Sequence, residues 1–138
     1  MKKLTLVIPA KKESESLPKV LDSLKEINCK IIVSLKEDDI QTINSIKDFN
    51  VTIYKQKGNG YGNSLTEAIN ICDTEWFCIF NADGSFTQED LYKMYALMDK
   101  NDFVYASRYL KESGSEDDTV VTLIGNKIFS VIGKIFFS

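Results

Sequence analysis

The sequence predicts an α/β protein built on an open, mostly parallel sheet with helices on both faces. Short apolar segments rich in β-branched residues alternate along the chain with segments whose apolar residues recur at helical spacing. Such alternation is typical of βαβ units, in which a helix connects two parallel strands. The chain has 138 residues, 43% of them hydrophobic, which is enough for one domain with its own core.

The first half of the chain predicts three strands and two helices. Residues 3–9 (KLTLVIP) are short, apolar and β-branched, as in a buried parallel strand. Apolar residues then recur at helical spacing over 17–24, after a serine and near a proline suited to a helix start. A second strand is expected at 30–35, a weaker helix at 40–49 and a third strand at 51–55.

The second half continues the alternation. After the glycine-rich GNGYGN, apolar residues over 65–72 mark one face of a helix, and EWFCIF (75–80) predicts the fourth strand. Thr87 and Asp90 have the spacing of a capping box at the start of the next helix. DFVYAS (102–107) predicts a fifth strand.

This topology selects the candidate binding segments. Ligands of open α/β sheets bind beyond the carboxyl ends of the strands. The segments expected at that edge are 9–13, 34–39, 56–63, 81–85 and 107–108.

Composition excludes several classes of function. The chain has no histidine, which rules out Ser–His–Asp and Cys–His catalysis and His-ligated zinc within it. A net charge of −3 without a basic stripe argues against nucleic-acid binding. The three cysteines form no C-x-x-C pair and are expected to be small core residues in a reducing compartment. The apolar run 4–10 is short and contains a proline, so a first strand and a cytoplasmic protein are expected rather than a signal peptide.

Three glycines follow the third expected strand, in KGNGYGN: Gly58, Gly60 and Gly62. The segment follows a strand and opens a helix, as the dinucleotide fingerprint G-x-G-x-x-G does, but the position of the third glycine does not fit. Two interpretations stay open on the residues alone. The segment is either a flexible turn or a place where the backbone approaches a ligand closely.

Asn81 and Asp83 stand one residue apart where the fourth expected strand ends, just before Gly84. Asn, Asp and Gly favour a strand-to-helix turn. A carboxylate at this edge is also well placed to hold Mg²⁺ or Mn²⁺, which prefer oxygen ligands and are often shared with substrate phosphates. Arg108, after the last expected strand, is either a solvated charge or a clamp for a phosphate.

The tail 120–137 is richly apolar but interrupted by glycines and lysines, and it is too short and polar for a comfortable membrane span. It predicts an amphipathic helix, so that 1–118 is expected to form the ligand-binding domain and 119–138 a separate helical region. The helix is expected either to lie on a membrane surface, which would make the protein peripheral at the inner face of the membrane, or to pack against another segment or a second copy of the chain.

Taken in order, four segments resemble motifs of the family 2 glycosyltransferases with a GT-A fold. VIPAKKESESLPKVLDSL is similar to P-A-Y-N-E-E-x-x-L, and GYGNSLTEAI to G-x-G-x-A-L-x-x-G-I. FNADGSFTQEDL is similar to D-x-D followed by S-x-x-P-E-x-L. ASRYLKESGSEDDTVVTLIGNKIFSVI is similar to G-S-R-Y-x-x-G-S and the I-G-N helix. The resemblance covers nearly the whole chain and is greatest to the dolichyl- or polyprenyl-phosphate sugar transferases.

This resemblance implies a metal-dependent, inverting transfer of a sugar from a nucleotide-diphosphate donor to a lipid phosphate, in the synthesis of cell-envelope polysaccharide. It implies catalytic roles for Asp83 and for Arg108, which would face the diphosphate or the acceptor phosphate. Asp83, with Asn81 beside it, would bind Mg²⁺ or Mn²⁺. The residues that it implies for nucleotide binding are Pro9, Ala10, Glu13, Gly60, Gly62, Asn81 and Asp83.

The sequence also departs from the family pattern. Asn81 replaces the first aspartate of D-x-D, and SLKEDD replaces D-D-G-S-x-D, which moves the acids to Glu37, Asp38 and Asp39. The chain ends inside the helix after I-G-N, where the family continues, so a truncated form is expected. The alternatives are a nucleotide-sugar-binding module without turnover and a transferase with a non-lipid saccharide acceptor.

Overall fold

The computed structural model describes residues 1–106 and 120–137. The chain divides into two compact units, Met1–Val104 and Tyr105–Ser138, and each is described by itself. The predicted domain boundary at 118/119 and the predicted site residue Arg108 lie outside the described residues.

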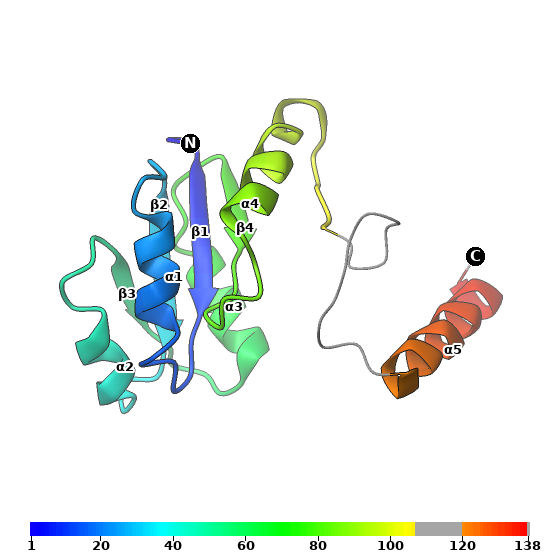
Figure 1. The fold of residues 1–138 in the computed structure, drawn as a ribbon, viewed down its shortest axis with the longest axis horizontal. Helices are drawn as coiled ribbons and strands as arrows, with labels where there is room; N and C mark the ends of the chain where they lie inside the picture. The colour runs from blue at the N-terminus through cyan, green and yellow to red at the C-terminus, as the bar shows by residue number, and fades with distance from the viewer. Residues whose placement is uncertain (107–119, 138) are drawn as a thin grey trace. The chain divides into compact units, whose positions relative to one another are not determined.

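The first unit is built on a parallel four-stranded sheet, which confirms the predicted α/β fold (Figure 1). The strands are short and apolar and follow the order β3-β2-β1-β4 across the sheet. In the register, Val7 of β1 lies opposite Ile32 of β2 on one side and Ile79 of β4 on the other. The strand bounds are Leu4–Pro9 (β1), Lys30–Leu35 (β2), Thr52–Lys55 (β3) and Trp76–Ile79 (β4).

Helices cover both faces of this sheet. In Figure 1, α1 lies in front of the sheet and α3 behind it. Residues of α1 and α4 belong to one buried cluster and residues of α3 to another, so the faces have separate cores. The helices of the first unit are α1 (Leu17–Leu24), α2 (Ile40–Ser45), α3 (Tyr61–Ile69), α4 (Gln88–Tyr95) and the 3-10 turn η1 (Met98–Lys100).

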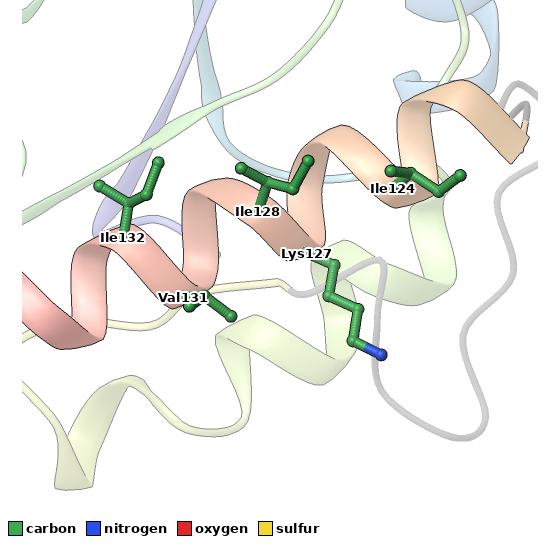
Figure 2. A pocket seen from close by; sticks show the side chains of 5 residues that line it. All are labelled: Ile124, Lys127, Ile128, Val131 and Ile132. Atoms are coloured by element: carbon green, nitrogen blue, oxygen red, sulfur yellow. The ribbon is translucent and has the colours of Figure 1, made fainter.

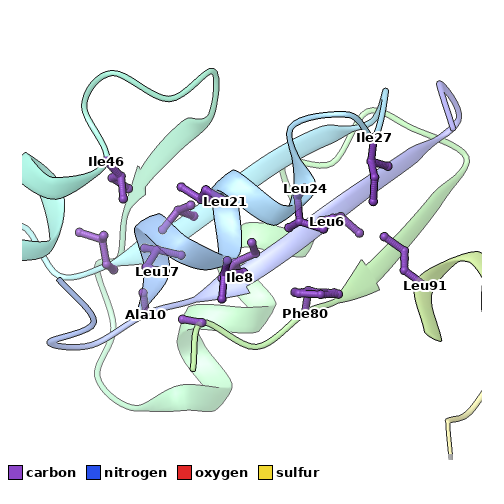
Figure 3. Close-up of a cluster of buried hydrophobic side chains, with 14 of the residues drawn as sticks. Leu6, Ile8, Ala10, Leu17, Leu21, Leu24, Ile27, Ile46, Phe80 and Leu91 are labelled. Atoms are coloured by element: carbon purple, nitrogen blue, oxygen red, sulfur yellow. The ribbon is translucent and has the colours of Figure 1, made fainter. Parts of the chain in front are cut away.

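The alternation of side chains along β1 explains the two cores. Leu4, Leu6 and Ile8 point to the larger cluster, and Val7 to the smaller one. Figure 3 shows the larger cluster, in which β1 side chains meet those of α1 and Phe80 after β4. The smaller cluster is formed by Val7, Ile32 and Ala68. Cys29 and Cys78 pack on the larger cluster and Cys72 on the smaller, as expected for core cysteines.

Two predicted helix starts are present, and their capping differs. Thr87 caps α4, since its hydroxyl accepts a hydrogen bond from the Asp90 N–H at 3.2 Å and donates to the Asp90 carboxylate at 2.7 Å. Ser16 occupies the cap position of α1 but forms no side-chain cap hydrogen bond. Its hydroxyl instead donates to the carboxylate of Glu13.

The predicted helix 40–49 is too long, because α2 ends at Ser45. Ile46 leaves the helical region, with φ −116° and ψ 5°, and its side chain is fully buried in the larger cluster. The Phe49 N–H then donates to the Ile46 carbonyl at 3.1 Å in a turn that leads to β3. The helix therefore ends where the backbone of Ile46 leaves the helical region, a change that the apolar spacing alone does not show.

The predicted fifth strand is wrong for 102–106, which form no strand in the described structure. Two of the apolar residues in the predicted strand are largely exposed, Phe103 at 66% and Tyr105 at 84%. A strand is stable only where a neighbouring strand takes part in its hydrogen bonds. The sheet of the described residues contains the four strands β3-β2-β1-β4, and residues 102–106 pair with none of them. The last residue of the prediction, Ser107, lies outside the described residues.

The second unit contains the predicted tail helix, α5 (Val120–Phe137). Figure 2 shows Ile124, Ile128 and Ile132 in a row along one side of α5, with Lys127 and Val131 on a neighbouring side. Seven apolar side chains of α5 are between 43% and 74% exposed: Ile124, Ile128, Phe129, Val131, Ile132, Ile135 and Phe136. In the described parts of the chain, no helix is both long and apolar enough to cross a membrane.

Candidate functional site

A large open cleft lies at the carboxyl edge of the sheet, where the loops after all four strands meet. Its volume is about 1710 Å³. The predicted site residues that line it are Pro9, Ala10, Glu13, Gly60, Asn81 and Asp83. Gly62, in the first turn of α3, is not among the lining residues. The cleft therefore joins segments that are distant in sequence, at the edge of the sheet where they were expected.

The loop after β1 is held by hydrogen bonds to the loop after β2. The Lys12 N–H donates to Asp39 Oδ2 at 2.7 Å, and the Glu13 N–H donates to Thr42 Oγ1 at 3.0 Å. Lys12 has φ +60°, in the left-handed region that residues with a Cβ rarely adopt. Thr42 is fully buried, so one end of this connection is fixed in the protein interior.

The acids that follow β2 are largely engaged within the protein. Asp39 caps α2, because its Oδ1 accepts the Thr42 N–H at 3.4 Å. Burial raises the pKa of Asp39, but the hydrogen bonds from the Lys12 backbone and from the side chain and backbone of Thr42 outweigh burial and leave that pKa below its ordinary value. Glu37 forms an ion pair with Lys55 at 2.6 Å, and the hydrogen bond from Lys55 lowers its pKa. Asp38 is exposed and lines the cleft.

The glycine-rich segment after β3 is held in place by side-chain hydrogen bonds. The carboxylate of Glu67 in α3 accepts the N–H groups of Lys57 at 2.8 Å and Gly58 at 2.7 Å. These backbone hydrogen bonds lower the pKa of Glu67. The side-chain amide of Gln56 donates to the carbonyls of Gly58 and Gly60, both at 2.9 Å. The loop is thus closed from both sides by side chains.

Gly60 is the residue of this loop for which glycine matters most. It occupies the cap position of α3 with φ +86°, a conformation that strains any residue with a Cβ. Nothing lies within 4 Å of the place where a Cβ would stand, and Gly60 lines the cleft. A ligand can therefore approach the backbone at this point, as the second interpretation of the glycines expected.

Buried serines fix the start of α3 to the end of β2. Ser64 Oγ lies 2.8 Å from Ser34 Oγ and donates to the Ser34 carbonyl at 3.2 Å. Both serines are at most 4% exposed. Hydrogen bonds buried in this way keep their geometry because neither partner can exchange to water without a penalty. The α3 edge of the cleft is therefore rigidly placed relative to β2.

Asn81 and Asp83 build the turn after β4. Asp83 Oδ1 accepts the Ser85 N–H at 2.9 Å, and Asn81 Nδ2 donates to Ser85 Oγ at 2.9 Å. Gly84 has φ +84°. Asn81, Asp83 and Gly84 therefore do form a turn after β4, as the first interpretation expected. Asp83 is also exposed and lines the cleft, so the turn presents its carboxylate at the carboxyl edge.

The residues of this turn fit a divalent cation only in part. Within residues 1–106 and 120–137, no three His, Cys, Asp or Glu side chains are grouped so as to hold a metal ion. Asp83 can supply one charged oxygen and Asn81 one amide oxygen. Such a pair suits Mg²⁺ or Mn²⁺, which commonly take one or two protein oxygens and fill their other positions with substrate phosphates and water.

Comparison with known proteins agrees with this arrangement of fold and cleft. Residues 5–136 match the glycosyl transferase family 2, and the chain belongs to that family. It is similar to uncharacterized glycosyltransferases of Rickettsia prowazekii and Rickettsia typhi, with 26% identity over 114 residues in each case. The match covers 80% of this chain and 37% of each relative, so the chain spans well under half the length of these relatives.

Sequence reasoning missed two groups that shape the cleft. The hydrogen bond from Lys12 to Asp39 depends on a left-handed backbone at a lysine, which no local pattern predicts. The hydrogen bonds of Glu67 join a helix residue to a loop ten positions earlier. An acid at a fixed distance after a glycine-rich loop is the signal that could have indicated the second group.

Proposed function

We propose that the cleft binds a nucleotide-diphosphate sugar and that the protein transfers the sugar to an acceptor. One observation carries this proposal: the loops after four parallel strands of a family 2 glycosyltransferase chain converge on one cleft lined by Pro9, Ala10, Glu13, Gly60, Asn81 and Asp83. Ligands of open α/β sheets bind at this edge.

Different loops of the cleft would bind different parts of the donor. The loop after β1, with Glu13, would take the nucleoside, because its backbone is fixed by hydrogen bonds to the β2 loop. Asp83, assisted by Asn81, would hold the cation next to the diphosphate. When bound, Mg²⁺ or Mn²⁺ would neutralise the charge that develops on the departing nucleoside diphosphate. Gly60 would let the backbone come close to the donor.

The acceptor that we propose is the phosphate of a polyprenyl lipid. An ionised phosphate is already a nucleophile, so its attack on the anomeric carbon requires no strong general base. A single displacement from the side opposite the leaving diphosphate inverts that carbon. The exposed apolar side chains of α5, together with Lys127 and Lys134, support a meeting with such an acceptor at an anionic membrane surface at the inner face of the membrane.

A second candidate function is nucleotide-sugar binding without turnover. Asn81 favours it, because an amide oxygen gives a cation less charge than the carboxylate of the family motif. A transferase with a saccharide acceptor is a third candidate and differs only in the acceptor. A product assay separates the three.

The test uses UDP-, GDP-, CDP- and dTDP-sugars, each with and without Mn²⁺. We expect one nucleotide to raise the unfolding temperature more than the other three, and its radiolabelled sugar to move into the organic phase when a polyprenyl phosphate is added. Binding of a nucleotide sugar without transfer of the sugar to lipid or saccharide would support the second candidate, a binding module without turnover. No stabilisation by any of the four would contradict the proposed function.

A further inference from the structure

Lys12 has an unusual backbone for a residue that lines a binding cleft. It is the one non-glycine residue with positive φ in the described chain, at +60°. A left-handed backbone costs free energy for any residue with a Cβ, and such residues persist only where surrounding groups hold them. At Lys12 the holding group is identifiable.

The holding group is the carboxylate of Asp39, whose two oxygens have separate partners. Oδ2 accepts the Lys12 N–H at 2.7 Å, and Oδ1 accepts the Thr42 N–H at 3.4 Å. Asp39 thus connects the loop after β1 to the start of α2, and the Thr42 hydroxyl adds a parallel connection to the Glu13 N–H at 3.0 Å. We call these three hydrogen bonds the Asp39 clasp.

The clasp fixes the part of the cleft that is formed by the loop after β1. Lys11, Lys12 and Glu13 line the cleft together with Asp39 itself. If the clasp opened, Lys12 would relax towards an ordinary backbone conformation and the peptide that leads to Glu13 would rotate. The side chains on both sides of Lys12 would then no longer face the cleft in their present arrangement.

We propose that Asp39 is a positioning residue for the nucleotide-diphosphate donor. It acts by holding Lys12 in the left-handed conformation and does not itself have to touch the ligand. This proposal rests on the proposed function for its ligand, whereas the clasp can be tested without any ligand.

Asp39→Asn is the most selective variant, because it changes one oxygen to a nitrogen. The remaining amide oxygen can cap α2, for which asparagine is as suitable as aspartate. Where that oxygen accepts the Thr42 N–H, the amide nitrogen faces the Lys12 N–H and that hydrogen bond is lost. Asp39→Ala removes both acceptor oxygens and gives the same loss whichever way the amide would turn. Asp48→Asn, at an exposed position outside the cleft, makes the same change of charge and serves as the matched control.

Lys12→Gly and Lys12→Ala form a second matched pair. Both remove the lysine side chain, but only glycine adopts a positive φ without strain. If Asp39 acts through the conformation of Lys12, the two variants should differ little while Asp39 is present. In the Asp39→Asn background the glycine variant should then bind the donor nucleotide more tightly than the alanine variant.

The experiment measures amide exchange of Lys12 by NMR in the free protein, and binding of UDP, GDP, CDP and dTDP with Mn²⁺ by calorimetry. We expect Asp39→Asn to remove the protection of the Lys12 amide and to weaken nucleotide binding about tenfold, the order set by the cost of an unsupported left-handed residue. Asp48→Asn should change neither. In the Asp39→Asn background, glycine at position 12 should bind about fivefold more tightly than alanine, against less than twofold with Asp39 present.

Three results would overturn the proposal. Unchanged protection of the Lys12 amide in both Asp39→Asn and Asp39→Ala would mean that the clasp does not exist in solution. Wild-type affinity in Asp39→Asn, or an equal glycine-to-alanine difference in both backgrounds, would mean that the clasp does not serve the ligand. If the wild-type chain binds none of the four nucleotides, the proposed function fails and the donor role of Asp39 fails with it, while the exchange data still decide whether the clasp forms.

Discussion

Asn81 and Asp83 share one turn but can offer a bound cation ligands of different charge. Asp83 Oδ1 is held by the Ser85 N–H and Asn81 Nδ2 by the Ser85 hydroxyl, so both side chains are oriented before a ligand arrives. Asp83 carries a full negative charge and Asn81 only the dipole of an amide. The charge that the chain can offer a metal therefore depends on what stands at position 81.

Restoring the family residue at position 81 should tighten metal binding. Asn81→Asp adds a charged oxygen at the same place, and hard cations such as Mn²⁺ favour charged oxygen ligands. We expect calorimetric titration with Mn²⁺ to show at least a severalfold higher affinity. Asn81→Ser, which keeps a polar side chain without the charge, is the control. Equal or weaker binding in Asn81→Asp would place residue 81 against the sugar or ribose instead.

Cys78 is expected to be the least reactive thiol in the described chain. Burial raises its pKa to about 11, and the neighbouring Cys29 adds to this effect. The thiolate is the reactive form, and its fraction falls tenfold for each unit by which the pKa exceeds the ordinary value of 9.0. At pH 8 we expect modification about 100-fold slower than for an exposed cysteine, with the rate still rising with pH beyond 10. Complete labelling within the time of a free thiol would show that β4 opens readily.

At the scale of elements, a strand or helix was predicted well where its signal lies within the segment itself. The strands β1 and β2 were predicted to within one residue, because a buried parallel strand has an apolar run that is visible in the sequence. The strand predicted at 102–107 failed over its described residues, because pairing depends on a neighbour elsewhere in the chain. The end of α2 was missed because the apolar spacing continues past Ile46, where the backbone leaves the helical region.

The candidate site follows the same rule. Most of the segments that line it were predicted, because strand direction decides which loops meet at one edge, whereas Ile40, Gln41 and Ser64 line the cleft outside the predicted segments. The Asp39 clasp and the Glu67 hydrogen bonds were not predicted, because they join side chains to backbone groups of other loops. Such contacts depend on distances in the folded protein, which the spacing of residues along the chain does not reveal.

The start of α4 offers a test of element stability. Thr87→Ala removes the hydroxyl that accepts the Asp90 N–H, and loss of such a cap costs about 1 kcal/mol. We expect chemical denaturation to show this decrease in the free energy of unfolding, with an unchanged dependence on denaturant. Thr87→Ser keeps the hydroxyl and should lose only a small part of it. A Thr87→Ala variant as stable as the wild type would show that α4 needs no cap.

The helix α5 should bring the protein to anionic vesicles. Its two charged residues, Lys127 and Lys134, are both cationic and lie seven positions apart, while seven of its apolar side chains are exposed. We expect the 138-residue chain to float with anionic liposomes, and a version that ends at Thr119 to remain in the dense fraction. Replacing both lysines by glutamine should weaken binding about 30-fold.

The competing interpretation of α5 is contact with protein. If the long and short versions float equally poorly while only the long one dimerises in analytical ultracentrifugation, α5 is an interface between copies of the chain. The lysine variant is then expected to dimerise as the wild type does. That result would remove the membrane surface from the proposed function without affecting the cleft.

At the scale of the whole molecule, ligand binding should appear as stability. A ligand that binds only the folded state, at about 100 times its dissociation constant, adds about 2.7 kcal/mol to the free energy of unfolding. We expect a nucleoside diphosphate to produce this increase with Mn²⁺ and to lose most of it in EDTA or in Asp83→Ala. An equal increase in EDTA would show that the cation has no part in binding.

The hydrogen bonds that Glu67 and Gln56 form with the glycine-rich loop have a consequence for the thermodynamics and speed of binding. A loop that orders only around its ligand loses conformational entropy at that moment, and affinity falls accordingly. Here Lys57, Gly58 and Gly60 are already held by side chains of the same unit. Little entropy is then left to lose at this side of the cleft, and encounter with the donor need not wait for the loop to fold.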